Sequence, residues 1–349
     1  MANRTDPPDD AGATVRVASV QVIPTLLGEF GLDPATVVRE AGLTPELFDD
    51  PDNLLAYRAR GRLLAHCARR TRCPHFGLLV GERGGLQSLG LVGLLAKNSP
   101  DVEAALRNLV VYFHLHVRGA ATRLAVGDRC ATLSYRAYEP GVEGSEQAGD
   151  GAVSIMFNIM RGLCGASWRP EEARFAHRRP DDVGPYRRFL MAPLVFDADD
   201  YSLVFARGWL GHRLPKPDVE LERLLKKHVA ALETAKGHRF PDQVRSVLSS
   251  ALLTGHASAP EVAALFSMHV RTFSRRLRES GTSFRALLDE QRLELASRML
   301  RDTNMDVGEI AAALGYADVS AFGRAFRRWN DATPARWRAD AVSRRAPSG

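Results

Sequence analysis

Arginine side chains recur at helical spacing in a short stretch of the last hundred residues. Arg271, Arg275 and Arg278 stand at positions i, i+4 and i+7, so a helix over this stretch would carry them as one outward stripe. A guanidinium can donate two hydrogen bonds to the edge of a guanine, and it can also neutralise a backbone phosphate. A solvated charged face is the alternative for any such stripe, but the elements around it favour DNA contact.

A second stretch, closer to the C-terminus, repeats this pattern. Ser320, Arg324 and Arg327 follow the same spacing, and Arg328 lies beside them. The opposite side of the same helix carries an aromatic stripe of Phe322, Phe326 and Trp329. Aromatic residues at this spacing are typical of a buried core rather than of a base-stacking surface.

Each stripe needs a pair of short helices to position it. In the first pair, Ser258 and Glu261 form a capping box at the start of the leading helix. A tight turn over 267–269 follows, and the second helix begins at about Val270 with Phe273 and Leu277 facing inward. This is the pattern of a helix-turn-helix, which places its second helix in the DNA major groove.

The second pair follows the same logic. Asp306 and Glu309 form another capping box, Gly315 closes the leading helix, and Asp318 caps the second one. A long helix, from the cap at Ser283 to about residue 301, joins the two pairs and spans roughly 27 Å. Successive major-groove faces of a duplex are about 34 Å apart, so one chain could read two neighbouring grooves.

The charge distribution supports this interpretation. The chain of 349 residues has a net charge of +6, and from residue 236 onward 18 Lys and Arg stand against 12 Asp and Glu. The first 235 residues carry 29 residues of each sign. Compositional bias explains why most basic residues are arginine, but not why the excess positive charge lies with the two helix pairs, as phosphate binding would require.

Residues upstream of the helix pairs predict an α+β domain. Residues 120–137 alternate apolar and polar side chains around Gly127-Asp128, which indicates a β-hairpin. Two further strands are expected at 174–177 and 202–205, around a short helix at 185–190, with helices flanking a few antiparallel strands. The predicted organisation is a disordered tail (1–15), this domain (16–214), a linker helix region (215–239) and an all-α DNA-binding domain (240–345).

Nothing in the sequence indicates catalysis or a cofactor. The alternative of an enzyme fused to a DNA-binding tail requires a constellation in residues 16–215, and that region has no GxSxG, no HExxH and no metal-spaced Cys/His cluster. The glycine-rich stretch 81–93 lacks the ending of a phosphate loop and favours a turn between helices. With neither a signal peptide nor 18 uninterrupted apolar residues, we expect a cytoplasmic protein without a membrane partner.

On these residues the chain resembles the AraC/XylS family of bacterial transcription regulators. The family-like stretches are 268–300 and 310–338, which cover much of the region holding the two helix pairs. Shorter stretches at 33–43, 88–116 and 185–205 resemble the effector-binding domain of the arabinose-binding-like branch.

The resemblance implies particular roles for residues of the two stripes. The implied base contacts are Val270, Arg271, Ser274, Arg275, Val319, Ser320 and Arg324. The implied phosphate contacts are Arg278, Arg327, Arg328 and Arg338. His269 stands where the family usually has a serine that caps the recognition helix, which puts the docking of that helix in doubt.

The resemblance also implies a function. The expected protein is a sequence-specific regulator, an activator by family habit, that binds promoter half-sites as a homodimer, contacts RNA polymerase and responds to a small molecule bound by its N-terminal domain. The alternative is an N-terminal domain that only dimerises or contacts polymerase. No effector contact can be named, because the Arg, His and Tyr residues are scattered through the sequence of that domain.

Overall fold

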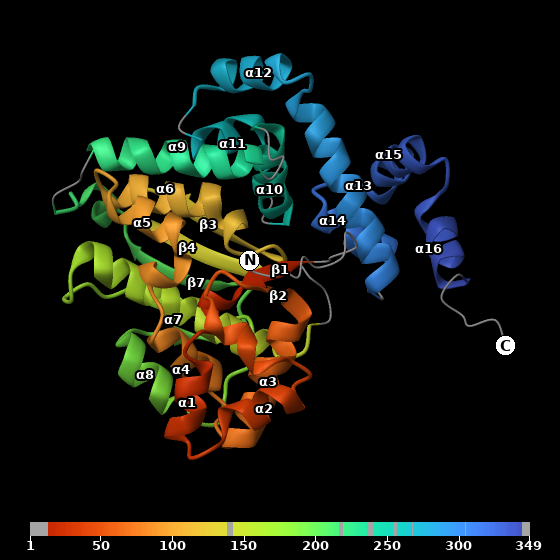
Figure 1. Cartoon of the computed structure of the whole chain (residues 1–349). Coiled ribbons are helices and arrows are strands. Elements are labelled where there is room, and N and C mark those ends of the chain that lie inside the picture. Colours follow the sequence, from red (N-terminus) through yellow and green to blue (C-terminus); the bar gives the residue numbers. More distant parts are fainter. Residues whose placement is uncertain are drawn as a thin grey trace. The chain divides into compact units, whose positions relative to one another are not determined.

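The computed structural model describes residues 13–137, 142–215, 219–235, 240–253, 257–266, 268–303 and 305–343. The chain divides into two compact units, here called the N-terminal unit (Met1–Ala231) and the C-terminal unit (Leu232–Gly349) (Figure 1). Helix α9 (Val219–Ala235) lies in the expected linker region. Residues 1–12 of the expected tail and residues 216–218 and 236–239 of the expected linker lie outside the described residues.

A five-stranded sheet forms the centre of the N-terminal unit, with the strand order β3-β4-β7-β5-β6. The expected hairpin is present as β3 (Ala120–Val126) and β4 (Cys130–Ala137), and the strand expected at 202–205 appears as β7 (Tyr201–Ala206). The strand expected at 174–177 is corrected to β5 (Glu172–Arg174), which shares only Arg174 with the prediction. The pairs β3–β4, β4–β7 and β5–β7 are antiparallel, as expected, and the sheet also contains the short strand β6 (Leu194–Val195), which pairs with β5 in parallel. Only two residue pairs make this ladder, too few for the sequence to show it.

Helices pack around this sheet, and α7 (Ser145–Cys164) runs along it against β4 and β7 (Figure 1). The last two residues of the predicted tail, Thr14 and Val15, are ordered in a strand. They belong to β1 (Thr14–Arg16), which pairs with β2 (Leu54–Ala56), and Val15 is completely buried. The remaining helices of the unit are α1 (Ile23–Glu29), α2 (Pro34–Glu40), α3 (Tyr57–Thr71), α4 (Phe76–Glu82), α5 (Leu91–Lys97), α6 (Val102–Tyr112), α7 (Ser145–Cys164) and α8 (Gly184–Leu190).

Helices α4 and α7 touch backbone to backbone. A Cβ atom at Gly77 would collide with the carbonyl oxygen of Gln147, and one at Gly81 would collide with that of Gly151. The Gln147 side chain reinforces the contact, because its Oε1 accepts a hydrogen bond from the Gly77 N–H at 2.7 Å. The glycine-rich stretch thus begins at a helix contact and continues into the turn that the sequence predicted, with the 3₁₀ turn Leu86–Leu89 inside it.

Replacing Gly77 with alanine should destabilise the N-terminal unit by about 1–3 kcal/mol, because the added methyl group forces two helix backbones apart. Gly28, on α1, is the matched control, since a Cβ there meets nothing within 4 Å. Gly28→Ala should be neutral or stabilising by up to about 1 kcal/mol. Thermal unfolding of the two variants checks this, and equal melting temperatures would contradict the close contact.

The C-terminal unit is all α, and its helices begin where the sequence places their caps. Ser258 and Glu261 form the first capping box and Asp306 and Glu309 the second, while Ser283 caps the long connecting helix. The helices are α10 (Phe240–Leu253), α11 (Ala259–Leu265), α12 (Val270–Glu279), α13 (Phe284–Asp302), α14 (Val307–Ala313), α15 (Val319–Asn330) and α16 (Pro334–Ser343).

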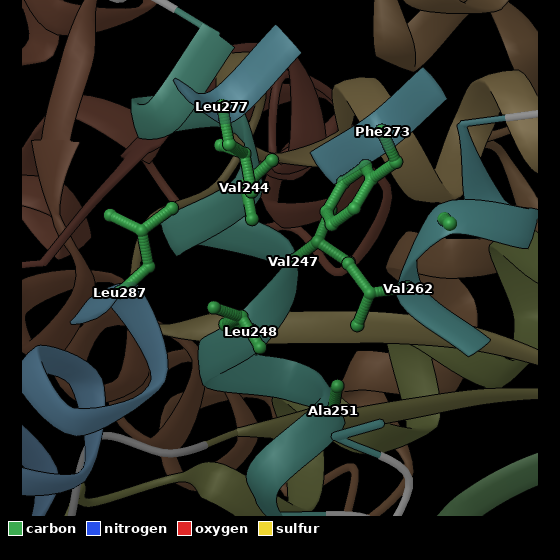
Figure 2. Packing of buried hydrophobic residues seen from close by; sticks show 9 residues of the cluster. Val244, Val247, Leu248, Ala251, Val262, Phe273, Leu277 and Leu287 are labelled. Atoms are coloured by element: carbon green, nitrogen blue, oxygen red, sulfur yellow. The ribbon is translucent and has the colours of Figure 1, made fainter. Parts of the chain in front are cut away.

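Two hydrophobic clusters hold this unit together, one for each helix-turn-helix. The first gathers side chains of α10, α11 and α12 around Phe273, and Leu287 joins it from the start of α13 (Figure 2). The second gathers α14 and α15 around Phe322 and Phe326, and Leu295 and further residues join it from the second half of α13. One continuous helix therefore belongs to both cores.

None of the helices in the described part of the chain is both long enough and apolar enough to cross a membrane.

Candidate nucleic-acid interface and an apolar cavity

The first recognition helix, α12, separates its two faces as the spacing predicts. Phe273 and Leu277 are fully buried, whereas Arg271, Arg275 and Arg278 are exposed. The buried pair fixes the rotation of the helix about its axis, because both side chains are held in the first cluster. The three guanidinium groups therefore project from the unit on the side facing away from its core.

The second recognition helix, α15, repeats this arrangement. Phe322 and Phe326 are fully buried, and the exposed side chains are Ser320, Arg324, Arg327 and Arg328. Trp329 is only partly buried, although it packs against the second cluster as the aromatic stripe predicted.

Contacts made by the exposed arginines within the chain are weak. Arg275 Nε lies 3.6 Å from Glu279 Oε1, with both side chains about two-thirds exposed, and Arg328 lies 3.6 Å from Asp289. Exposed ion pairs of this kind contribute about 0–1 kcal/mol, so exchanging the carboxylate for a phosphate or a base edge costs little.

Two of the remaining candidate base contacts are less exposed. Val270 is half-buried and packs against the first cluster, and Ser274 is half-buried one turn later on α12. Val319, at the start of α15, is by contrast 49% exposed, which is high for an aliphatic side chain. An exposed valine at the tip of a recognition helix is suited to contact a thymine methyl group.

Arg338 differs from the other candidate phosphate contacts. It is half-buried, and its guanidinium donates hydrogen bonds to the carbonyl oxygens of Leu300 (3.2 Å) and Met305 (2.5 Å). These bonds satisfy carbonyls at and beyond the end of α13, which indicates a structural role. A phosphate contact by Arg338 stays a prediction, and it would have to share a guanidinium that is already engaged.

His269 does cap α12. Its Nδ1 accepts a hydrogen bond from the Arg271 N–H at 3.3 Å, and its backbone has the extended conformation typical of an N-cap. The bond is long for an N–H donor, so the imidazole replaces the usual serine with a weaker contact.

The N-terminal unit contains an apolar cavity that sequence reasoning did not find. It lies between the β3–β4 hairpin and helices α3, α4, α6 and α7, and it encloses about 760 Å³ not occupied by protein atoms, part of it open to solvent. Most of its lining is aliphatic or aromatic, as at Leu64, Leu109, Phe113, Leu133 and Ile159. Small-molecule sites have this character: a mostly apolar wall with few polar groups.

Polar side chains from distant parts of the sequence converge on this cavity. Arg60 comes from α3, His116 follows the 3₁₀ turn after α6, and Tyr135 comes from β4. Their separation along the chain explains why sequence reasoning left them scattered. Helical periodicity marks α3 and α6, but it does not show which of their residues meet a strand.

Two helix-turn-helix pairs that share a helix and present exposed arginines define a DNA-binding protein. The helix-turn-helix family model matches residues 262–340, and the arabinose-binding domain of AraC transcription regulators matches residues 31–214, more than half of the chain. The chain belongs to the AraC family of transcription regulators. It is a DNA-binding transcription regulator with an arabinose-binding-like N-terminal domain, and the family and its relatives are regulators rather than enzymes.

Two of the relatives align over nearly the whole chain, and a third aligns over about a third of it. The HTH-type transcriptional regulator VirS of Mycobacterium tuberculosis is 27% identical over 95% of this chain and 98% of its own length. The ornithine utilization regulator of Pseudomonas aeruginosa is 24% identical over 93% of this chain and 96% of its own. The transcriptional activator NphR of a Rhodococcus species is 32% identical, over 34% of this chain and 36% of its own.

Proposed function

We propose that this regulator activates transcription when a small molecule occupies the apolar cavity of its N-terminal unit. The cavity carries the proposal, because dimerisation alone does not require an apolar cavity on whose wall a few polar side chains converge. A ligand that binds one conformation more tightly would shift the population of DNA-binding states. One relative is named an activator and another a regulator of ornithine use, which supports control by a metabolite.

The proposed assembly is a homodimer on two promoter half-sites that contacts RNA polymerase, because two linked sites multiply affinity and specificity. The proposed base contacts are Val270, Arg271, Ser274, Arg275, Val319, Ser320 and Arg324. The proposed phosphate contacts are Arg278, Arg327 and Arg328. Arg338 would contribute less to phosphate binding, because its guanidinium already donates to main-chain carbonyls.

Arg324→Ala should weaken binding to the specific site by about 1–3 kcal/mol while leaving binding to unrelated DNA nearly unchanged, because a bidentate contact to guanine is lost. Arg275→Ala should behave in the same way on the other recognition helix. Fluorescence anisotropy on specific and scrambled duplexes measures both, and Arg285→Ala, an exposed arginine on α13, is the control. Equal losses on the two duplexes would assign these arginines to phosphate binding.

A thermal-shift screen of the full chain tests the effector proposal, with amino acids, sugars, aromatic acids and fatty acids as the panel. A ligand at about 100 times its dissociation constant stabilises the folded state by about 2.7 kcal/mol, which raises the melting temperature by several degrees. A true effector must also change promoter affinity or transcript yield in vitro. If no compound of any class raises the melting temperature, an N-terminal unit that only dimerises or contacts polymerase would be favoured.

A further inference from the structure

Arg60 brings a permanent positive charge to the wall of the apolar cavity. Among the described residues that line the cavity there is no aspartate, glutamate or lysine, and Arg60 is only 6% exposed. A guanidinium stays protonated in proteins, so burial does not remove this charge.

The contacts of Arg60 are with neutral groups. One terminal nitrogen donates to the Tyr135 hydroxyl at 3.2 Å, and the guanidinium carbon lies 4.4 Å from the centre of the Tyr57 ring. The two tyrosine hydroxyls are joined to each other at 2.7 Å. Among the described residues the Arg60 Nε has no hydrogen-bond partner, although it is fully buried.

The protein groups around Arg60 compensate its buried charge only in part. A charge that leaves water must recover its hydration energy from a partner of opposite charge or from hydrogen bonds, and here two hydroxyls and an aromatic face supply only part of it. Burial, followed by the neighbouring Tyr135, raises the pKa of Tyr57 well above its ordinary value, so the Tyr57 hydroxyl does not supply a negative charge to Arg60. An anionic ligand would compensate the remainder of this charge.

His116 limits how much negative charge the cavity can hold. Burial, with the nearby Arg16 and Arg60, lowers the pKa of His116 to about 3, so its ring is neutral at physiological pH. Its Nδ1 is buried, and no hydrogen-bond partner for it exists among the described residues. The imidazole therefore offers a polar contact to a ligand but not a second positive charge.

We propose that the apolar cavity binds an amphipathic monocarboxylate, with its carboxylate on Arg60 and its hydrocarbon body among the aliphatic residues of α6, α7 and β4. The inference rests on the proposed function and specifies the chemical class of the effector. One guanidinium matches one carboxylate, which can take the vacant Nε–H together with a terminal N–H as a bidentate pair.

The lining disfavours the other ligand classes. A sugar needs several hydrogen-bond partners around its ring, whereas the wall is mostly aliphatic and aromatic. A zwitterionic amino acid needs an anion for its ammonium group, and no carboxylate lines the cavity among the described residues. A phosphate dianion would leave half of its charge uncompensated by one arginine.

Titration calorimetry on the full chain tests the proposal with ligands that differ only in their head group. Decanoate and phenylbutyrate should bind, whereas decanol, phenylbutanol and decylamine should bind at least tenfold more weakly, because they cannot form the charge-assisted pair. This comparison uses the unaltered chain and does not depend on the folding of a variant.

Arg60→Gln should weaken decanoate binding about tenfold to a hundredfold and leave decanol binding unchanged. Arg62→Gln is the matched control, because Arg62 is exposed on the same helix, outside the cavity lining. Circular dichroism confirms that both variants fold.

The outcomes separate this inference from the proposed function. Binding of acids alone, with loss in Arg60→Gln only, supports the monocarboxylate. Equal binding of acids and alcohols, or a sugar or amino acid as the one ligand in the broad screen, overturns the monocarboxylate and leaves small-molecule control standing. Absence of binding by every compound in both panels overturns the two together.

Discussion

Phe273→Ala is expected to lower the free energy of unfolding of the C-terminal unit by about 3–5 kcal/mol, a large part of the 5–15 kcal/mol that holds a typical domain folded. Phe273 is fully buried, and its ring centre lies 5.8 to 6.0 Å from those of Phe240, Phe266 and Phe284. Truncation therefore removes the common member of an aromatic cluster that joins α10, α11, α12 and α13.

The damage should extend beyond the first helix-turn-helix, because α13 contributes to both cores. Amide hydrogen exchange on the full chain, resolved by peptide, should show lost protection in α14 and α15 as well as in α12. Thr272→Ala is the control, since Thr272 is exposed on the same helix. Unchanged protection in α15 would mean that the two cores unfold independently.

Affinity for DNA is expected to fall steeply with salt. Neutralising the phosphates beside Arg278, Arg327 and Arg328 in one chain gives a slope of about −2.7 in a plot of log K against log salt, or roughly a fortyfold loss between 50 and 200 mM. Two chains on two half-sites double the slope and give a loss of about 1,800-fold. The measured slope thus also reports how many chains are bound.

Anisotropy titrations of the full chain at four salt concentrations measure this slope. Arg327→Gln should make it shallower by about 0.9 for each chain bound, because one fewer counterion is released. The same substitution at Arg338 should change the slope little, since that guanidinium already donates to main-chain carbonyls. A flat salt response of the unaltered chain would contradict phosphate binding by these residues.

The C-terminal unit could be predicted from the sequence because its signals are local. A capping box spans four residues, and the faces of α12 and α15 are set by side chains three and four positions apart. The bonds of Arg338 were not predictable, because its partners lie 38 and 33 residues away and are backbone carbonyls, which every residue has.

The N-terminal unit shows the opposite case. Its hairpin was predicted from alternation around Gly127-Asp128, whereas the cavity depends on contacts between residues far apart in sequence. Arg60 and Tyr135 are 75 residues apart, and neither belongs to a spacing pattern that would mark it. The close contact between Gly77 and the backbone of α7 was also not predictable, because a glycine in a helix does not show which backbone it touches.

The place of α13 in both cores limits how this protein can evolve. One residue inserted into a helix rotates everything beyond it by about 100° and advances it by about 1.5 Å. Such a change in α13 would turn Leu295 and Leu300 out of the second cluster and aim the second stripe of arginines at a different side of the duplex. Insertions and deletions are therefore expected in the loops of this lineage and not in α13. For the same reason, the length of α13 should fix the number of base pairs between the two DNA segments that α12 and α15 are proposed to contact within one half-site.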